Sequence, residues 1–250
     1  MFYGIPSDRI EKFKQALDYI RETYNGSVFA SDMLIAIEKN LTFRKDRKFA
    51  DSFRASIETE QEHSLAWRLH VLTWAASHAL HIEGDFVECG VFRGFSSAVI
   101  CKYLDFESLP QQFYLYDTFS GLAAETSTVE EREKWSEYED FDPDRLLEHV
   151  NQVFSVYPNV KIVKGIVPHS FTEAVPEKIA YLHLDMNSSI AEIMALQELF
   201  PRMSKGAILV LDDFGWLANK NQSIAELEFM HEFKHKVLEL PTGQGLVIKH

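Results

Sequence analysis

The sequence predicts an α/β fold with a doubly wound parallel sheet that ends in an antiparallel hairpin and follows a helical extension. From Gly84 onward, near-continuous apolar runs alternate with helical patterns, as in parallel sheets that helices cover on both faces. In the final stretch, KVLELPTGQGLVIKH, two strand-like runs flank a turn rich in Pro and Gly. With 250 residues, 46% of them hydrophobic, the chain can bury a full core.

Residues 1–80 are expected to form the helical extension, and residues 81–250 the main domain. Apolar residues from Ile10 to Tyr24 recur at helical spacing. Ser7 is expected to cap this helix, and Asn25-Gly26 to end it.

Two more helices are expected in the extension, a short one over residues 31–39 and a longer one from Thr59. Between them lies the one basic run, TFRKDRKF, which is interpreted as a solvated connector. Three polar residues of the longer helix are assigned ordinary positions on its surface, although they are near enough in sequence to reach a ligand of the next loop: His63, Arg68 and His70.

Five apolar runs are interpreted as the parallel strands, each separated from the next by a helix or a helical pattern. No repeat or low-complexity linker divides this region. The runs are DFVEC (85–89), QFYLYD (112–117), VKIVKG (160–165), IAYLHLD (179–185) and GAILVLDD (206–213).

Four of these five strands end in an acid, namely Glu88, Asp117, Asp185 and the pair Asp212-Asp213. Ligands of such sheets bind at the carboxyl ends of the strands, near the point where the strand order reverses. Carboxylates are costly beside an apolar interior unless they are solvated, paired or bound to a cation. Although any single acid could be a helix cap, the set predicts a ligand site at this edge.

The loop GDFVECGVFRGFSS, which follows the first of these strands, argues against a phosphate ligand. It lacks the Gly-Lys-Ser/Thr of a P-loop and the third glycine of the dinucleotide fingerprint, which disfavours an NAD-dependent oxidoreductase. Glu88 would repel a pyrophosphate and attract a cation. A positively charged ligand with a ribose fits, and we expect S-adenosylmethionine, with its ribose hydroxyls on Asp117.

Composition restricts the partners further. The formal net charge of −13 argues against a nucleic-acid partner. The sequence also contains no run of about 18 apolar residues, the length that a helix needs to cross a membrane. Cys89 and Cys101 do not form a metal-type pair, and the first ten residues are too charged for a secretory signal. We expect a cytoplasmic protein with a small-molecule substrate, and a homodimer stays open.

Four segments, GDFVECGVFRG, LYDTFSGL, YLHLDM and LFPRMSKGAILVLDDFG, resemble the macrocin O-methyltransferase (TylF-type) family of class I S-adenosylmethionine-dependent methyltransferases. The resemblance covers about residues 60–250. It implies a Rossmann-like sheet of seven strands with the last one antiparallel. It also implies Mg²⁺-dependent methylation of a hydroxyl, typically on a sugar of a glycosylated natural product.

The resemblance also implies the roles of individual residues. Asp185, Asp212 and Asp213 would hold the metal, and carboxylates from two neighbouring strand ends suit Mg²⁺. From their positions at the strand ends rather than from the resemblance, we expect Asp185, His183 or His169 to accept the proton of the acceptor hydroxyl, and the sequence does not decide among them. The resemblance implies that the cofactor is bound by Glu88, Gly90, Gly94, Ser96 and Asp117. Three neighbours at the same strand ends are also expected to contact it: Arg93, Thr118 and Gly165.

The chain departs from the family pattern in one loop. Where the family has Leu-Asp-x-Asp-x-Tyr-x-x-Thr, this chain has LDMNSSIAE, so Asn187 replaces the second acid and Ser189 the tyrosine. Asn187 can form hydrogen bonds but cannot act as a base. Two alternatives therefore stay open: a cofactor-binding protein without catalysis, and a methyltransferase for phenol- or catechol-type acceptors.

The acidic segment ETSTVEEREKWSEYEDFD, residues 125–142, is longer than a compact connection needs. It is expected to be either a lid over the site or a solvated acidic segment. Trp135, Tyr138 and Phe141 favour the lid, because aromatic side chains could cover a ring-shaped acceptor.

Overall fold

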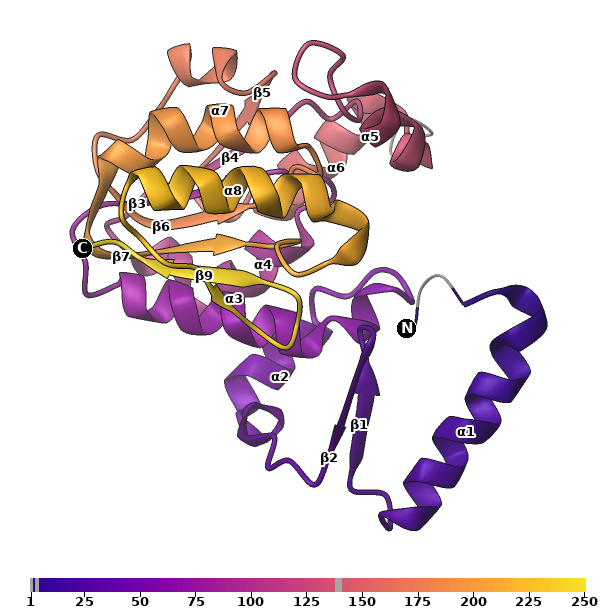
Figure 1. Cartoon of the computed structure of the whole chain (residues 1–250). Coiled ribbons are helices and arrows are strands. Elements are labelled where there is room, and N and C mark those ends of the chain that lie inside the picture. Colours follow the sequence, from indigo (N-terminus) through magenta and orange to yellow (C-terminus); the bar gives the residue numbers. More distant parts are fainter. Residues whose placement is uncertain (1, 3–4, 138–140) are drawn as a thin grey trace.

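The computed structural model describes residue 2, residues 5–137 and residues 141–250. Its centre is a seven-stranded sheet with the order β5-β4-β3-β6-β7-β9-β8 (Figure 1). The strands are β3 (Asp85–Cys89), β4 (Phe113–Asp117), β5 (Val160–Lys164), β6 (Ile179–Leu184), β7 (Met203–Leu211), β8 (Leu238–Glu239) and β9 (Gly245–Ile248).

The first five of these strands are parallel, whereas β9 pairs antiparallel with both β7 and β8. The predicted fold class and the terminal hairpin are thus confirmed. Because β3 pairs with β4 on one side and with β6 on the other, the strand order reverses between β3 and β6. This reversal makes the carboxyl ends of β3 and β6 the expected ligand site.

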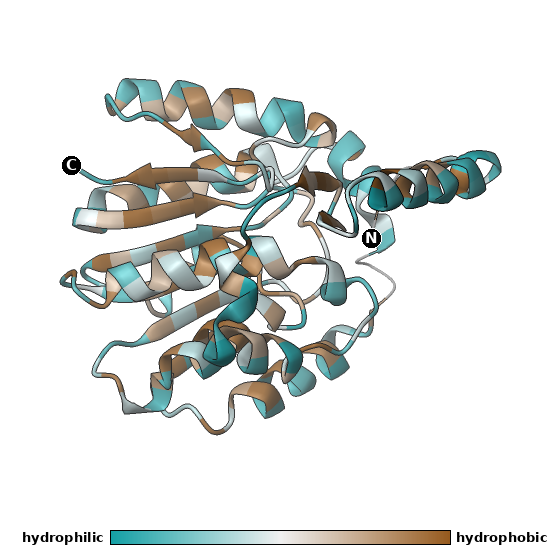
Figure 2. Cartoon of the chain, turned by 90° about the horizontal axis from the view of Figure 1, so that it is seen from below, coloured by the Kyte–Doolittle hydropathy of each residue, from teal (hydrophilic) through white to brown (hydrophobic). Residues whose placement is uncertain are grey.

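Helices cover both faces of the sheet, and each face has its own apolar core. One core contains buried residues of α3 (Ala66–Ala79), α4 (Phe95–Leu104) and α6 (Pro143–Phe154), with α2 (Arg47–Arg54) packed on α4. The other core contains residues of α7 (Ser189–Leu199) and α8 (Lys220–Glu232). Figure 2 shows apolar strands between helices of mixed hydropathy. None of the helices in the described part of the chain has the length and apolar content needed to cross a membrane.

The N-terminal part differs from its prediction at one element. The expected helix over residues 31–39 is wrong, because β1 (Val28–Ser31) and β2 (Leu34–Ile37) form an antiparallel hairpin there. Asp32 and Met33 both adopt positive φ, 49° and 59°, as the residues of a two-residue hairpin turn do. This turn between two apolar runs overrides the weak helical spacing.

The other helices of the extension form with shifted boundaries. The predicted first helix is α1 (Ile10–Thr23), and Ser7 does not cap it but begins a 3-10 turn, Ser7–Arg9. The helix expected from Thr59 starts only at Ala66, because the Glu62 carboxylate accepts the backbone N–H groups of Glu58 and Thr59 and closes a turn before it. In Figure 1, α1 and the hairpin stand apart from the layers of the sheet. The division at residue 80 stays a prediction.

Candidate active site

A buried chain of charges lies where the strand order reverses. His183 on β6 is fully buried, and its Nδ1 lies 2.8 Å from Glu88 Oε1 at the end of β3. Its Nε2 lies 3.3 Å from Asp212 Oδ1, which follows β7. Burial alone would lower the pKa of His183, but hydrogen bonds to Asp212 and Glu88 outweigh it and raise this pKa to about 10. His183 is therefore an imidazolium that bridges two carboxylates.

Arg68 of α3 supplies the second buried cation. Its guanidinium contacts the Asp212 carboxylate and lies 3.4 Å from Asp213 Oδ1. The expectation that Arg68 has an ordinary position on the helix surface is wrong, since its side chain is 9% exposed. A signal was present in the sequence, because Arg68 precedes Leu72 by one helical turn on the apolar stripe of this helix.

Asp32 is a site residue that the sequence analysis missed. It stands at the turn of the β1–β2 hairpin, is 5% exposed, and accepts a hydrogen bond from Arg68 Nε at 3.3 Å. The expected helix over residues 31–39 would not have predicted a position for Asp32 beside the sheet. The turn of the hairpin places Asp32 next to Arg68, so the N-terminal part contributes a side chain to the charged site.

Negative charge is in excess in this cluster. Five carboxyl groups lie here, those of Asp32, Glu88, Asp185, Asp212 and Asp213, and the cations in direct contact with them among the described residues are Arg68 and His183. Burial raises the pKa values of three of them, Asp32, Asp185 and Asp213, and that of Asp213 reaches about 6. The pKa of Asp212 is lowered instead, because Arg68 and His183 outweigh its burial. The cluster thus has room for additional positive charge.

Asp185 is the least satisfied of these groups. Its carboxylate forms no hydrogen bond with another described residue. Donor atoms of His183, Asp185 and Asp212 lie within 4.8 Å of one another, but both His183 nitrogens are used on carboxylates, so the oxygens of Asp185 and Asp212 are the donors left for a shared cation. Asp213 contacts Arg68 through Oδ1 and accepts from Asn219 Nδ2 through Oδ2 at 2.9 Å, and each oxygen keeps a lone pair for a further partner. Unpaired hard oxygen donors in a buried, negative site fit a divalent cation such as Mg²⁺.

The two glycines of the GDFVECGVFRGFSS loop are explained by close packing. Gly90 has φ +91°, and a Cβ there would lie 1.9 Å from the backbone oxygen of Asp185. Gly94 has φ +83°, and a Cβ there would lie 2.7 Å from the ring of Phe154. Gly90 therefore lets the end of β3 approach Asp185, which couples the position of this loop to that of the acidic cluster.

Asp117 shapes the same loop from the end of β4. Its Oδ2 accepts the backbone N–H groups of Val91 (2.6 Å) and Phe92 (2.8 Å), and its Oδ1 accepts that of Phe119 (2.7 Å). A carboxylate offers about four lone-pair positions, so Oδ1 retains capacity for a further donor. This spare capacity is compatible with a hydroxyl donor such as that of a ribose.

The remaining predicted residues lie around this edge or outside the cluster. Arg93 pairs with Glu58, and the Thr118 hydroxyl donates to Gly121 O at 2.7 Å. Gly165 donates its N–H to Asp117 O at 2.9 Å, while Ser96 lies in the first turn of α4. His169 is exposed and lies 3.4 Å from Glu125, so no contact joins it to the buried acids.

The loop that departs from the family pattern follows Asp185 directly and leads into α7. Asn187 adopts φ 55°, and its Oδ1 is buried without a hydrogen-bond partner among the described residues. Ser188 is the N-cap of α7, and Glu192 accepts the Met186 N–H at 3.0 Å. Asn187 Oδ1 and Glu192 Oε2 are thus two buried acceptors of this segment without a hydrogen-bond partner among the described residues.

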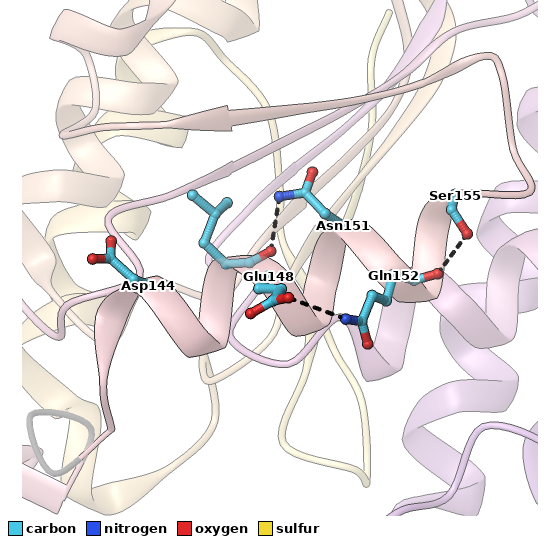
Figure 3. Close-up of a pocket in the computed structure, with 6 residues that line it drawn as sticks. Asp144, Glu148, Asn151, Gln152 and Ser155 are labelled. Atoms are coloured by element: carbon cyan, nitrogen blue, oxygen red, sulfur yellow. Dashed lines mark hydrogen bonds between the residues drawn. The ribbon is translucent and has the colours of Figure 1, made fainter.

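The acidic segment contains the short helix α5 (Val129–Lys134) and lies against the site. Phe141 packs edge-on against Phe92 of the glycine loop, with ring centroids 4.9 Å apart. Trp135 is half-buried, whereas Tyr138 lies outside the described residues. A further hollow does not belong to the site, since its lining residues all come from α6 and its C-cap, Ser155 (Figure 3). The residues of α6 are Asp144, Leu147, Glu148, Asn151 and Gln152.

The strand order and the antiparallel end of the sheet define a Rossmann-like methyltransferase fold. The calicheamicin methyltransferase CalS11 is similar, with a TM-score of 0.63 and 15% identity over 99% of this chain and 95% of that chain. The O-methyltransferase NovP gives a TM-score of 0.59 and 19% identity over 73% of this chain and 79% of that chain. The SAH-bound methyltransferase PaMTH1 of Podospora anserina gives 0.50 and 11% over the full length of both chains.

Residues 31–242 match the model of the family described as Macrocin-O-methyltransferase (TylF). The chain therefore belongs to this family of S-adenosylmethionine-dependent O-methyltransferases, which confirms the resemblance seen in its motifs. The match begins at the β1–β2 hairpin, earlier than the resemblance predicted, and so includes Asp32. A search of curated proteins found no match.

Proposed function

We propose that this protein transfers the methyl group of S-adenosylmethionine to a sugar hydroxyl of a small molecule and needs a divalent cation to do so. The family membership supports the methyl donor and the O-methylation. CalS11, which has a similar structure, is a TDP-rhamnose 3'-O-methyltransferase, and this supports a sugar acceptor. The excess of buried and half-buried carboxyl groups, with no hydrogen-bond partner for Asp185 among the described residues, is the observation that supports a metal requirement.

Asp185, Asp212 and Asp213 would hold the cation, and their oxygen donors and buried excess charge fit Mg²⁺. A divalent cation bound there would make the acceptor hydroxyl more acidic. Arg68 keeps Asp212 ionised and fixes both carboxyl groups that follow β7. Most of the rate acceleration is then expected from positioning of the acceptor oxygen.

The role of general base, which accepts the proton of the acceptor hydroxyl, is assigned to Asp185. Asn187 has no basic form, and His183 uses both ring nitrogens on carboxylates while fully buried. His169 is exposed and faces Glu125 instead. The third predicted acceptor, Asp185, has a carboxylate with no hydrogen-bond partner in the described part of the chain.

For the cofactor, we propose that Asp117 holds both the glycine loop and the ribose, with Gly90, Arg93, Gly94, Ser96, Thr118 and Gly165 around it. Glu88 is 1% exposed and bonded to His183 and Ser97. Its proposed contribution to cofactor binding is therefore indirect, through the fixed end of β3.

Calorimetric titration and a turnover assay test this function together. S-adenosylmethionine is expected to bind, and NAD is not. Methylation of nucleotide-activated deoxysugars should stop in EDTA and return with Mg²⁺ or Mn²⁺. Asp185→Ala should bind the cofactor without turnover, whereas Asp144→Asn, at an exposed carboxylate on α6, should behave as wild type.

Two outcomes would contradict parts of the proposal. Full turnover in EDTA would refute the metal requirement, and preferred methylation of a catechol would refute the sugar acceptor. The second candidate is a cofactor-binding protein without catalysis, which Asn187 favours because it replaces an acid. Cofactor binding without turnover, unchanged by Asn187→Asp, would support that candidate.

A further inference from the structure

We propose that Glu131 and Lys134 of α5 are positioning residues that brace the two loops carrying Asp185 and Asp212-Asp213. The effect of this brace on catalysis rests on the proposed function, since these acids matter to catalysis only if they hold the cation. Its structural part, a brace between α5 and both loops, stands on contacts alone.

Glu131 braces the loop after β6. Its Oε1 accepts both the backbone N–H (2.9 Å) and the hydroxyl (2.8 Å) of Ser189, and Ser188 Oγ lies 3.3 Å from its Oε2. Ser189 begins α7, so its N–H is one of the donors that a helix leaves unpaired at its start. A carboxylate there also interacts favourably with the helix dipole. Glu131 thus acts as an external cap of the helix that follows Asp185.

The charge of Glu131 is secured by these contacts. Burial would raise its pKa, but the hydrogen bonds from Thr128 and Ser189 outweigh this and leave the pKa lowered. The side chain is therefore ionised at neutral pH and keeps its full acceptor capacity.

Lys134 braces the loop after β7. Its Nζ donates to Ala218 O at 2.6 Å and contacts Asn219 Oδ1. The same Asn219 uses its amide nitrogen to donate to Asp213 Oδ2 at 2.9 Å. One short chain of hydrogen bonds thus runs from α5 through Asn219 to a carboxyl group of the acidic cluster.

Local contacts keep α5 in the shape that this brace needs. Thr128 and Glu131 form a capping box, in which each side chain accepts the backbone N–H of the other residue. Arg132 ties the helix back to Ser127 O at 2.8 Å. Because Glu131 and Lys134 are three residues apart, they lie on one side of the helix and can reach both loops together.

Hydrogen exchange and metal titration of single variants test the brace. Glu131→Gln and Ser189→Ala should speed amide exchange in residues 186–191 at least tenfold, and Lys134→Met should do so in residues 217–222. Each of Glu131→Gln and Lys134→Met should weaken Mn²⁺ binding to the cofactor-free protein at least threefold and leave S-adenosylmethionine affinity within twofold. Glu130→Gln and Glu133→Gln, at exposed positions of the same helix, are the matched controls.

Exchange and Mn²⁺ affinity equal to those of the two controls would overturn the inference. If the wild-type protein binds no Mn²⁺, the metal in the proposed function fails, while the exchange measurement still decides whether α5 braces the loops. Ser189→Ala removes only one hydroxyl, so it tests the contact without a change of charge.

Discussion

Arg68 and Asp212 are joined twice, because one guanidinium nitrogen contacts the Asp212 carboxylate and also donates to the Asp212 backbone oxygen at 3.1 Å. The residues are 144 positions apart in sequence. The bond ties α3 to the loop after β7, and through Asp32 it ties the N-terminal hairpin to the same point.

Replacement of Arg68 by Met should therefore destabilise the protein strongly. The change leaves buried carboxylates without their partner, and removal of one member of a buried ion pair typically costs about 3–5 kcal/mol. Urea unfolding at pH 7 measures the loss. Arg54→Met, in an exposed pair with Asp51, should change little. An equal loss of unfolding free energy in the two variants would contradict the stabilising role of Arg68 in the buried cluster.

The metal-free protein should lose stability as the pH rises from about 6.5 to 10. His183 has a folded-state pKa of about 10 against 6.5 when unfolded, so its stabilising charge is fully present below pH 6.5 and is lost toward pH 10. A difference of one bound proton between the folded and unfolded states changes the free energy of unfolding by at most about 1.4 kcal/mol per pH unit. The free energy of unfolding, measured in urea across this range, should fall in wild type. His183→Gln should have the smaller slope, most clearly below about pH 8, because burial raises the pKa values of the Cys89 and Cys101 thiols and these add a fall common to both proteins at higher pH. Equal slopes below about pH 8 would refute the bridging imidazolium.

Gly90→Ala should be far more damaging than Gly26→Ala, although both glycines have positive φ. At Gly26 an added Cβ meets nothing within 4 Å, so only backbone strain of about 1–3 kcal/mol is expected. At Gly90 the Cβ would lie 1.9 Å from Asp185 O, and the end of β6 must move. Urea unfolding of both variants, with Mn²⁺ titration of any that fold, checks the difference. Comparable losses would show that the close approach at Gly90 is not needed.

Asp117→Ala should lower both stability and cofactor affinity, the latter at least tenfold. Each lost hydrogen bond to an ionised acceptor costs about 1.5–3 kcal/mol. To separate loop shaping from ribose binding, S-adenosylhomocysteine is compared with its 2',3'-dideoxy analogue on both proteins. The wild type should prefer the ligand with hydroxyls, whereas the variant should bind the two almost equally. An undiminished preference in Asp117→Ala would place the ribose elsewhere.

The sequence alone determined the layered sheet, its antiparallel end and the edge at which the acids gather. These features follow from local patterns: apolar runs of strand length, helical spacing between them, and a Pro- and Gly-containing turn. Asp185, Asp212 and Asp213 could be grouped in advance, because parallel strands bring their carboxyl ends to one edge.

Tertiary structure decided which charges meet. Asp32 reaches Arg68 only because two residues of positive φ turn residues 28–37 into a hairpin, and Arg68 reaches Asp212 across 144 positions. Likewise, Gly90 is explained by the backbone of Asp185, and Glu131 by the start of α7. Each of these contacts joins segments that share no local pattern, so the pairing of charges depends on packing that a linear sequence pattern does not contain.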